Sequence, residues 1–415
     1  MARVKKILML VENQSVPVDP RVWPEALVLR EQGMQVSIIC PKGLTKHRES
    51  YVCIDGIHIY RYHLPEVGRK SIAYFVEYSV ALLMTFWLSL KVLFRRGFDV
   101  IHTANPPDMF FVIGLFYKLF GKKVIFDQHD LSPEMFRVIY HERLSFLHRA
   151  LLFMERWSYR TANLVITTNS SQKQFALSRG GCDISKVFVV RNGPDISRLE
   201  VPAPDLALKR GRRYLLAYVG LMAAQDGVEY TLYALHELVH KRGRQDISLV
   251  LMGDGDAAPA LRTLAHQLEL DEYVKFTGWT EKHDVLRYLA TADVGLSPDP
   301  QNGLNEYCTM IKTMEYMAMV KPIVAFDLAE TRVSAQGSAL YAAPNVVEDF
   351  ADNIEILLDN EDLRRTLGAI GRRRIEEELS WMYSAKNLLL AYETVFPPDP
   401  EPHVSEPAKH LVVSD

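Results

Sequence analysis

TMIKTMEYMAMVKPIVAFD, residues 309–327, joins a helical pattern to a short apolar run. Pro322 prevents the helix from continuing, and the run PIVAF is typical of a buried strand. A helix that leads directly into a buried strand is the repeating unit of a parallel α/β sheet. Lys312 and Glu315 stand three residues apart in this helix, so the pattern predicts that they share one helix face.

Apolar runs rich in β-branched residues recur along the chain and predict two sets of strands. In the first half we expect strands at 5–11, 35–40, 99–103, 123–128, 163–168 and 186–192, and helices at 21–32, 72–94, 107–120 and 145–161. In the second half we expect strands at 214–220, 247–253, 274–279, 294–298, 322–326 and 339–343. Strands that alternate with helices indicate an α/β fold with two doubly wound, Rossmann-like parallel sheets. Ligands in such sheets bind beyond the carboxyl ends of the strands, so we expect a cleft between two facing domains.

The 415 residues are too many for one ordinary core. We expect a first domain over residues 1–194, a linker over 195–213 and a second domain over 214–380. A helix over 381–396 should cross back to the first domain, and residues 397–415, rich in proline and polar residues, should form a disordered tail.

Composition excludes several classes of protein. The four cysteines form no CxxC pair, which favours a reducing compartment and argues against a structural zinc site. Residues 1–200 contain 27 Lys and Arg against 18 Asp and Glu, whereas the remainder contains 21 against 33. The basic half suggests contact with an anionic surface or ligand, with chance surface composition as the alternative. A pI near 6.5 and the lack of interleaved basic and aromatic residues argue against nucleic-acid binding.

The segment 72–94 is the most apolar helix pattern. Its uncharged run between Glu77 and Lys91 is 13 residues long, shorter than the roughly 20 that span a bilayer. Its aromatic residues, followed by Arg95 and Arg96, suit a helix at a membrane surface. A buried core helix is the alternative. We therefore expect a cytoplasmic protein and keep open a peripheral contact with the inner face of the membrane.

Two strand ends have the layout of a diphosphate-binding turn, in which a glycine and a polar loop precede a helix N-terminus with free N–H groups. The first is Gly220 with Gln225, Asp226 and Gly227, and the second begins at Gly253. The acidic residues that follow Gly253 suggest caps rather than a metal site.

Lys312 and Glu315 suit a nucleotide-sugar donor. A cation would bind its diphosphate, and a carboxylate would accept hydrogen bonds from its ribose diol. A plain ion pair between the two residues is the alternative reading.

These segments together resemble family 4 retaining glycosyltransferases, which have the GT-B architecture, and most closely a bacterial subgroup linked to polysaccharide assembly. In the second half the resemblance rests on residues 309–327 and on YVGLMAAQDGVEYTLYAL (218–235), LVLMGDG (249–255), VKFTGW (274–279) and TADVGLSPDP (291–300). In the first half it rests on VDPRVWPEALVLREQGMQVSIICP (18–41), IHTANPPD (101–108), FDQHDLSPE (126–134) and VVRNGPD (189–195).

The resemblance implies that a sugar, of hexosyltransferase type, moves with retention from a nucleotide-diphosphate donor to an acceptor hydroxyl, without a bound metal or cofactor. Glu315 matches the second glutamate of the family's Glu-x7-Glu motif, which grips the donor ribose. The first glutamate falls at Tyr307, so Asn305 and Glu306 are the candidates to replace it. Gln225 stands where a basic residue is expected, which leaves Lys312 as the best cation for the leaving diphosphate.

The remaining donor residues implied are Thr280, near the base, and Thr309. The family usually has glycine at the position of Val320. Because a β-branched residue resists a left-handed cap, we expect this helix to end in another geometry.

In the first domain, His129 and Asp130 follow a strand directly, and the resemblance places this histidine against the transferred sugar or the acceptor. A satisfied structural histidine is the alternative. Four further residues follow strands of this domain and are expected to shape the acceptor side, where turn and cap chemistry is the alternative: Asp19, Arg21, Asn105 and Asp108.

The expected acceptor is a lipid-linked molecule or a saccharide. Two other functions remain open. One is a non-catalytic partner subunit of a glycosyltransferase complex, which Tyr307 and Gln225 favour. The other is a nucleotide-sugar epimerase of similar architecture. No carboxylate pair indicates a glycosidase.

Overall fold

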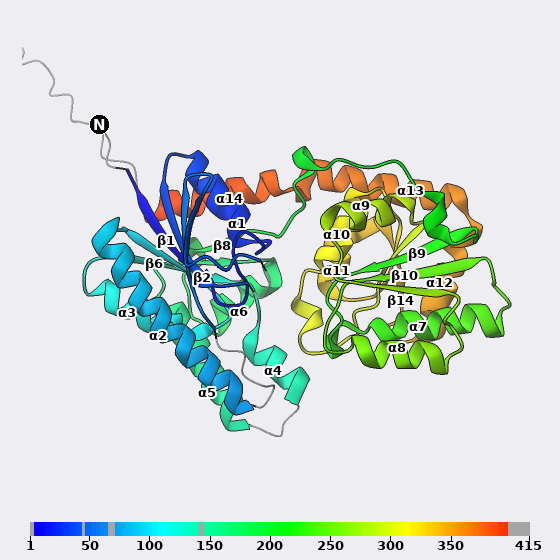
Figure 1. The fold of residues 1–415 in the computed structure, drawn as a ribbon, viewed down its shortest axis with the longest axis horizontal. Coiled ribbons are helices and arrows are strands. Elements are labelled where there is room, and N and C mark those ends of the chain that lie inside the picture. Colours follow the sequence, from blue (N-terminus) through cyan, green and yellow to red (C-terminus); the bar gives the residue numbers. More distant parts are fainter. Residues whose placement is uncertain (1–3, 44–45, 65–70, 141–144, 397–415) are drawn as a thin grey trace, which may run out of the picture.

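The computed structural model describes residues 4–43, 46–64, 71–140 and 145–396. It contains two α/β units side by side, each built on its own sheet (Figure 1). The tail expected over residues 397–415 lies outside the described residues.

The first sheet has eight strands in the order β3-β4-β2-β1-β5-β6-β7-β8. Its strands are β1 (Lys6–Leu10), β2 (Gln35–Pro41), β3 (Tyr51–Ile54), β4 (Ile57–Tyr62), β5 (Val100–Ala104), β6 (Lys123–Gln128), β7 (Leu164–Thr167) and β8 (Val187–Val189). All pairs are parallel except β3 with β4. These two strands form a hairpin that the sequence prediction missed. Asp55 and Gly56 connect them, both with positive φ, as a tight hairpin turn requires.

The helices of this unit lie on both faces of the sheet. They are α1 (Val22–Glu31), α2 (Ser71–Arg95), α3 (Phe111–Lys118), α4 (Ser132–Tyr140), α5 (Ser145–Thr161) and α6 (Ser170–Ser178). The expected helix at 107–120 begins instead as a 3-10 turn, Asp108–Phe110, before α3. Helices α4 and α6 were not predicted. One core joins α1 to the sheet, and a second joins α2 and α3 to the opposite face.

The second sheet has six parallel strands in the order β11-β10-β9-β12-β13-β14. Its strands are β9 (Tyr214–Val219), β10 (Ile247–Met252), β11 (Val274–Gly278), β12 (Val294–Ser297), β13 (Ile323–Phe326) and β14 (Ala339–Ala342). Its helices are α7 (Val228–His236), α8 (Ala258–Gln267), α9 (Lys282–Thr291), α10 (Ile311–Ala318), α11 (Ala329–Ala335), α12 (Val347–Asp359) and α13 (Glu361–Arg374). Every strand lies where the apolar runs predict it, since a strand buried on both faces reads as a continuous apolar run.

Residues on either side of the second unit connect it to the first. The segment 195–213 forms two short 3-10 turns, Ile196–Arg198 and Leu206–Lys209. The last helix, α14 (Trp381–Val395), returns to the first sheet, where Leu388, Ala391 and Tyr392 enter the core.

The expectation for the end of α10 is wrong. Val320 has φ +59°, so the helix ends in the left-handed geometry that a β-branched residue resists. The N–H of Lys321 bonds to the carbonyl of Tyr316, and that of Val320 to the carbonyl of Met317. The hydrogen bonds that these two carbonyls accept before the turn into β13 outweigh the conformational cost of a left-handed valine.

Candidate active site

The turns after β9 and β10 touch backbone to backbone. Gly220 has φ +150° and Gly253 has φ +128°. A Cβ atom on Gly253 would lie 1.9 Å from the carbonyl oxygen of Gly220, so only glycine fits there. A Cβ atom on Gly220 would lie 3.3 Å from Cε of Lys312. The stem of Lys312 therefore lies directly on the first glycine turn.

Lys312 is paired, but not with Glu315. It lies on α10 with 8% of its surface exposed, and its Nζ is 2.5 Å from Oδ1 of Asp299. Asp299 also accepts a hydrogen bond of 2.6 Å from the Ser297 hydroxyl. Asp299, which sequence reasoning missed, thus already balances the positive charge expected to meet the diphosphate. Asp299 lies two residues beyond β12. A carboxylate directly after a buried strand is a sequence feature that could have predicted a site residue here.

Glu315 lies one turn further along α10 and is partly buried. Within the described residues its carboxylate has no hydrogen bond and no ion pair, whereas its backbone carbonyl accepts from the N–H of Met319. Burial raises the pKa of its carboxyl group to about 7, against the opposing effects of Lys282 and Lys312. A partly buried carboxylate without a partner is costly to the free protein and is typical of a ligand site.

The loop that contains Gln225, Asp226 and Gly227 is held from several sides. The Asp226 carboxylate accepts a hydrogen bond of 2.9 Å from the N–H of Ala223, and burial raises its pKa to about 6. A Cβ on Gly227 would lie 2.5 Å from the carbonyl oxygen of Pro298. Asn305 Nδ2 donates to the carbonyl of Gln225 at 2.9 Å. Asp226 and Asn305 therefore stabilise the loop.

Neither candidate for the missing first glutamate is free. Asn305 is buried and also donates to the carbonyl of Pro300. Glu306 Oε2 accepts from the N–H of Ala329, at the start of α11, and Oε1 accepts from Gln301. The structure thus gives both residues other partners. Thr280 likewise bonds through its hydroxyl to Thr277 and to the carbonyl of Gly278.

Tyr307, which replaces the expected glutamate, lies between the two domains. Its ring packs edge-on against Phe175 of α6, with centroids 4.9 Å apart. Asn169 Nδ2 donates to the carbonyl of Tyr307 at 2.9 Å and to the hydroxyl of Thr309 at 3.0 Å. Arg191 lies 3.7 Å from Glu330 across the same boundary. Sequence reasoning missed this interdomain contact, because its residues are far apart in the chain.

Loops of the two domains also converge around Cys308. Burial raises the pKa of its thiol far above the usual range, and the next contributions come from Asp130 of the first domain and Asp299 of the second. In addition, α4 contacts the turn Ala224–Asp226. The strand ends that the sequence singled out in each half therefore lie near one another.

In the first domain, Asp127 at the end of β6 organises the loop that holds His129. His129 Nε2 lies 2.6 Å from Asp127 Oδ2, and its ring is 11% exposed. Arg21 binds the same carboxylate through Nε at 2.9 Å and Nη2 at 2.6 Å. Burial alone would raise the pKa of Asp127, but Arg21 and His129 hold it well below its usual range. An aspartate inside an otherwise apolar strand is the sequence feature that could have predicted a functional role for Asp127.

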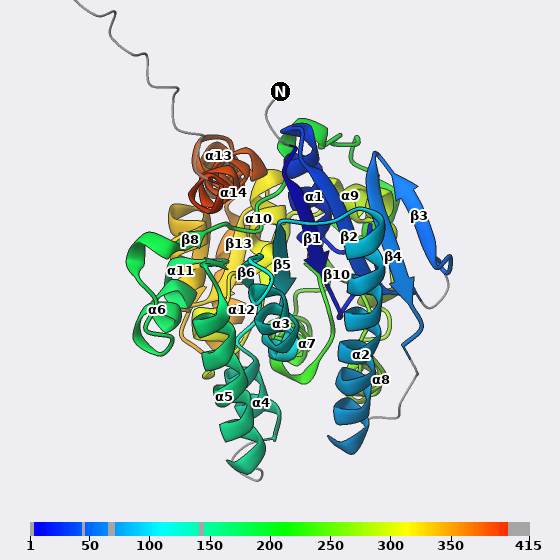
Figure 2. The same cartoon turned by 90° about the vertical axis from the view of Figure 1, so that its left-hand side faces the viewer.

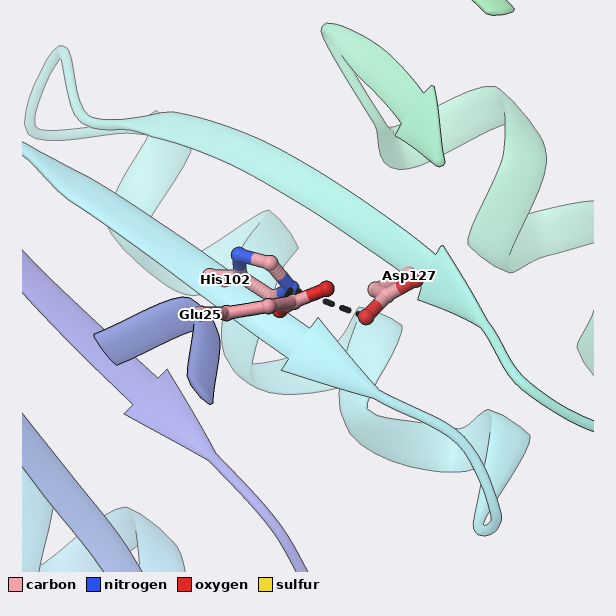
Figure 3. A group of neighbouring side chains, drawn as sticks. All are labelled: Glu25, His102 and Asp127. Atoms are coloured by element: carbon pink, nitrogen blue, oxygen red, sulfur yellow. Dashed lines mark ion pairs between the residues drawn. The ribbon is translucent and has the colours of Figure 1, made fainter. Parts of the chain in front are cut away.

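Glu25, His102 and Asp127 form a fully buried cluster (Figure 3). His102 Nε2 lies 3.3 Å from Asp127 Oδ2 and 3.5 Å from Glu25 Oε2. The cluster has the residue types of a metal site, but the Arg21 guanidinium already lies against both carboxylates, 3.5 Å from Glu25. His102 Nδ1 pairs with the hydroxyl of Tyr392 on α14 at 2.8 Å. We therefore interpret the cluster as a charge network that ties α14 to the His129 loop.

The four residues expected on the acceptor side, Asp19, Arg21, Asn105 and Asp108, are all buried. Asp19 Oδ1 accepts from the N–H groups of Arg21 and Val22 at the start of α1. Asn105 Nδ2 donates to Asp108 and to the carbonyl of Asp130, and its Oδ1 accepts from the N–H groups of His129 and Asp130. Asn105 thus holds the His129–Asp130 loop in place, while Asp19 caps α1.

Two cavities in the described part of the chain are not lined by Lys312, Glu315 or His129. One of about 520 Å³ is lined by residues around α8 and β11, including Arg262 and Phe276. The other, of about 290 Å³, lies beside α14 and includes Arg191 and Tyr383.

Comparisons with known proteins identify the family and the fold of the chain. Residues 25–198 match the model described as Glycosyltransferase Family 4, and residues 213–360 match that of Glycosyl transferases group 1. The sucrose-phosphate synthase structure from Thermosynechococcus elongatus aligns with a TM-score of 0.76 at 16% identity, over 94% of this chain and 99% of that chain. Anabaena HepE in complex with UDP-glucose aligns with a TM-score of 0.68 at 14% identity, over 94% and 99%.

Among curated relatives, a GDP-mannose-dependent monoacylated phosphatidylinositol monomannoside mannosyltransferase of Corynebacterium glutamicum is 31% identical over 172 residues. The match covers 40% of this chain and 44% of that protein.

The chain belongs to the family 4 type of glycosyltransferases and has the GT-B fold. It is a glycosyltransferase, as the resemblance of its motifs predicted.

Proposed function

We propose that the protein transfers a sugar, with retention and without a metal, from a nucleotide-diphosphate donor to an acceptor hydroxyl in cell-surface polysaccharide or glycolipid assembly. One observation carries the donor assignment. Glu315 is a partly buried carboxylate without a side-chain partner, one helical turn from the buried cation Lys312, whose Cε lies against the Gly220 turn. A nucleotide's ribose diol and diphosphate need these two kinds of group.

In this proposal Glu315 accepts hydrogen bonds from the ribose, while Lys312 and the Gly220 turn meet the diphosphate. The bond between the anomeric carbon and the diphosphate oxygen breaks, and the acceptor oxygen bonds to that carbon. The acceptor's proton passes to the departing phosphate oxygen. Lys312 stabilises the negative charge that develops there, and His129, oriented by Asp127, contacts the transferred sugar.

The proposed acceptor is a lipid-linked molecule or a saccharide, and the proposed location is the cytoplasm, at the inner face of the membrane. The lipid acceptor named for the Corynebacterium relative supports the first alternative.

A non-catalytic partner subunit is the second candidate. It is favoured by the pairing of Lys312 with Asp299, which already neutralises the one cation proposed for the diphosphate. A nucleotide-sugar epimerase would share the fold but would release an altered sugar without an acceptor.

A thermal-shift series with UDP-, GDP- and dTDP-sugars tests the donor assignment, because a ligand that binds only the folded state stabilises it. We expect one nucleotide class to raise the melting temperature of the parent and not of Glu315→Ala. Incubation with that donor should then release nucleoside diphosphate. Binding without release of diphosphate or any sugar product would favour the non-catalytic subunit, and no binding at all would refute the proposal.

A further inference from the structure

Helix α2 exposes large apolar side chains and buries mainly small or polar ones. Among the described side chains, its fully buried stripe consists of Ala81, Thr85, Ser89 and Val92, three of which are small or polar. The outward stripe is large and apolar: Trp87 is 68% exposed and Phe94 is 85% exposed. Positions two residues apart are about 200° apart around a helix, so these stripes lie on opposite sides. A water-facing helix of a soluble protein has the reverse arrangement.

The neighbouring helices repeat this pattern. In α5, Glu155, Ser158 and Thr161 are buried, whereas Phe146 is 78% exposed and Phe153 is largely exposed. After α3, Leu119 is 83% exposed. Helices α2 and α5 and the end of α3 thus expose large apolar side chains, while α2 and α5 bury polar ones.

The three helices lie side by side on one face of the first sheet (Figure 2). Phe86 of α2 packs edge-on against Phe116 of α3, with ring centroids 5.1 Å apart. Phe111 of α3 stacks on Trp157 of α5. Their outward side chains therefore form one apolar face, which we define by Leu83, Trp87, Phe94, Leu119, Phe146 and Phe153. An apolar area of this extent on a soluble domain marks an interaction site.

The charges around this face have one sign. Helices α2, α3 and α5 carry six basic residues, Lys91, Arg95, Lys118, Arg149, Arg156 and Arg160. Their only carboxylates are Glu77, which is partly buried, and Glu155, which is fully buried and paired with Arg179 at 2.6 Å. The partner of this face is therefore both apolar and anionic.

We propose that the apolar face docks on the surface of a lipid bilayer that contains anionic lipids. The side chains would enter the boundary between headgroups and acyl chains, and the basic residues would meet the headgroups. Within the described residues, one helix segment, Glu77–Arg95, is long and apolar enough to cross a membrane. Its stripe of buried small residues is held against the sheet, so it lies on the membrane instead.

A second copy of the chain is a poorer occupant. A symmetric dimer through this face would bring the same surface of both copies together, and the six basic residues of each would then repel one another. The proposal rests on the proposed function in one respect: docking on the membrane would bring the active site to a lipid-linked acceptor. Binding to a membrane is measured without sugar transfer, so the two can fail separately.

Co-sedimentation of the full chain with vesicles tests the proposal. We expect binding to vesicles of phosphatidylcholine with phosphatidylglycerol, weaker binding to phosphatidylcholine alone, and loss of binding as salt is raised. The variant Leu83→Ser/Trp87→Ser/Phe94→Ser should bind at least about 10-fold more weakly, because it removes three exposed apolar side chains that would be buried in the membrane. The control Ile356→Ser removes an exposed apolar side chain from α12 of the second domain and should bind as the parent does.

Both variants should keep the parent's melting temperature and its thermal shift with nucleotide sugars, which shows that they fold. No binding of the parent to either vesicle, or equal binding of parent and triple variant, would overturn the proposal. So would a dimer in solution that the triple variant converts to a monomer.

Discussion

Asp299 lies 2.5 Å from Lys312 and balances its charge at the carboxyl edge of the second sheet. The cation that the sequence assigned to a diphosphate therefore has a protein partner. A bound diphosphate would meet the pair and not a lone ammonium group.

Replacing Lys312 by methionine should lower both stability and sugar transfer. Asp299 would be left buried without its cation, which costs about 3 kcal/mol in the free energy of unfolding. Loss of a cation at the leaving group should lower kcat by about 100-fold.

The double variant Lys312→Met/Asp299→Asn separates the two effects, since it removes both charges together. Denaturant unfolding should show stability close to that of the parent, while kcat stays low. A double variant with parental turnover would show that Lys312 has only a structural role.

Glu315→Gln should raise stability increasingly as the pH rises from 4.5 to about 7, and by a constant amount above that. In the unfolded chain this carboxyl group titrates near 4.5, whereas burial raises its pKa to about 7 in the folded chain. The unfolded state therefore releases the proton first, so the contribution of the neutral group is complete below pH 4.5 and is lost as the pH rises through 7.

Thermal unfolding of parent and variant at pH 4 and pH 8 checks this sign. The two should coincide at the lower pH, and the variant should be the more stable at the higher pH. The same variant should lose its thermal shift with the nucleotide sugar, and a retained shift would contradict the ribose assignment.

His129→Gln should lower kcat without changing the affinity for nucleotide. Its ring is held by Asp127 on the first sheet, whereas the proposed nucleotide residues belong to the second. We expect a fall of about 100-fold in kcat with an unchanged thermal shift with the nucleoside diphosphate. His266→Gln, an exposed histidine paired with Asp271, is the control, and a loss of turnover in both variants would point to a general effect on folding.

Val320→Gly should stabilise the protein. Val320 has φ +59° and its side chain is exposed, so glycine removes a backbone strain of about 1 kcal/mol at little loss of packing. The matched control is Val333→Gly, an exposed valine within α11, where glycine should cost about 1 kcal/mol instead. Urea midpoints that move in the same direction for both variants would refute the argument.

Much of the architecture could be predicted from local patterns. The strands of the second sheet and the helix α5 lie where the apolar periodicity places them, because a buried parallel strand needs a continuous apolar run. The hairpin around Asp55 and Gly56 was missed although its turn signal is present. Helix α6 was missed because its apolar residues are few and its start depends on the Asn169 cap.

The candidate site was predictable only in its residue types. Lys312 and Glu315 do lie on neighbouring turns of one helix. Asn305 and Glu306, however, form hydrogen bonds with a loop and with the start of α11. Tyr307 acquired a role that no local pattern shows, since its partner Phe175 belongs to the other domain.

The sequence by itself determined two parallel sheets, the glycine turns at their strand ends and the family to which they belong, because these depend on neighbours a few residues apart. Only the tertiary structure decided which charges are paired. Asp299 is 13 residues from Lys312, and Asp127 is 106 residues from Arg21. Contacts at such separations are set by how the strands and helices pack, and that packing leaves the Glu315 carboxylate without a partner while it gives the Asn105 side chain four hydrogen bonds.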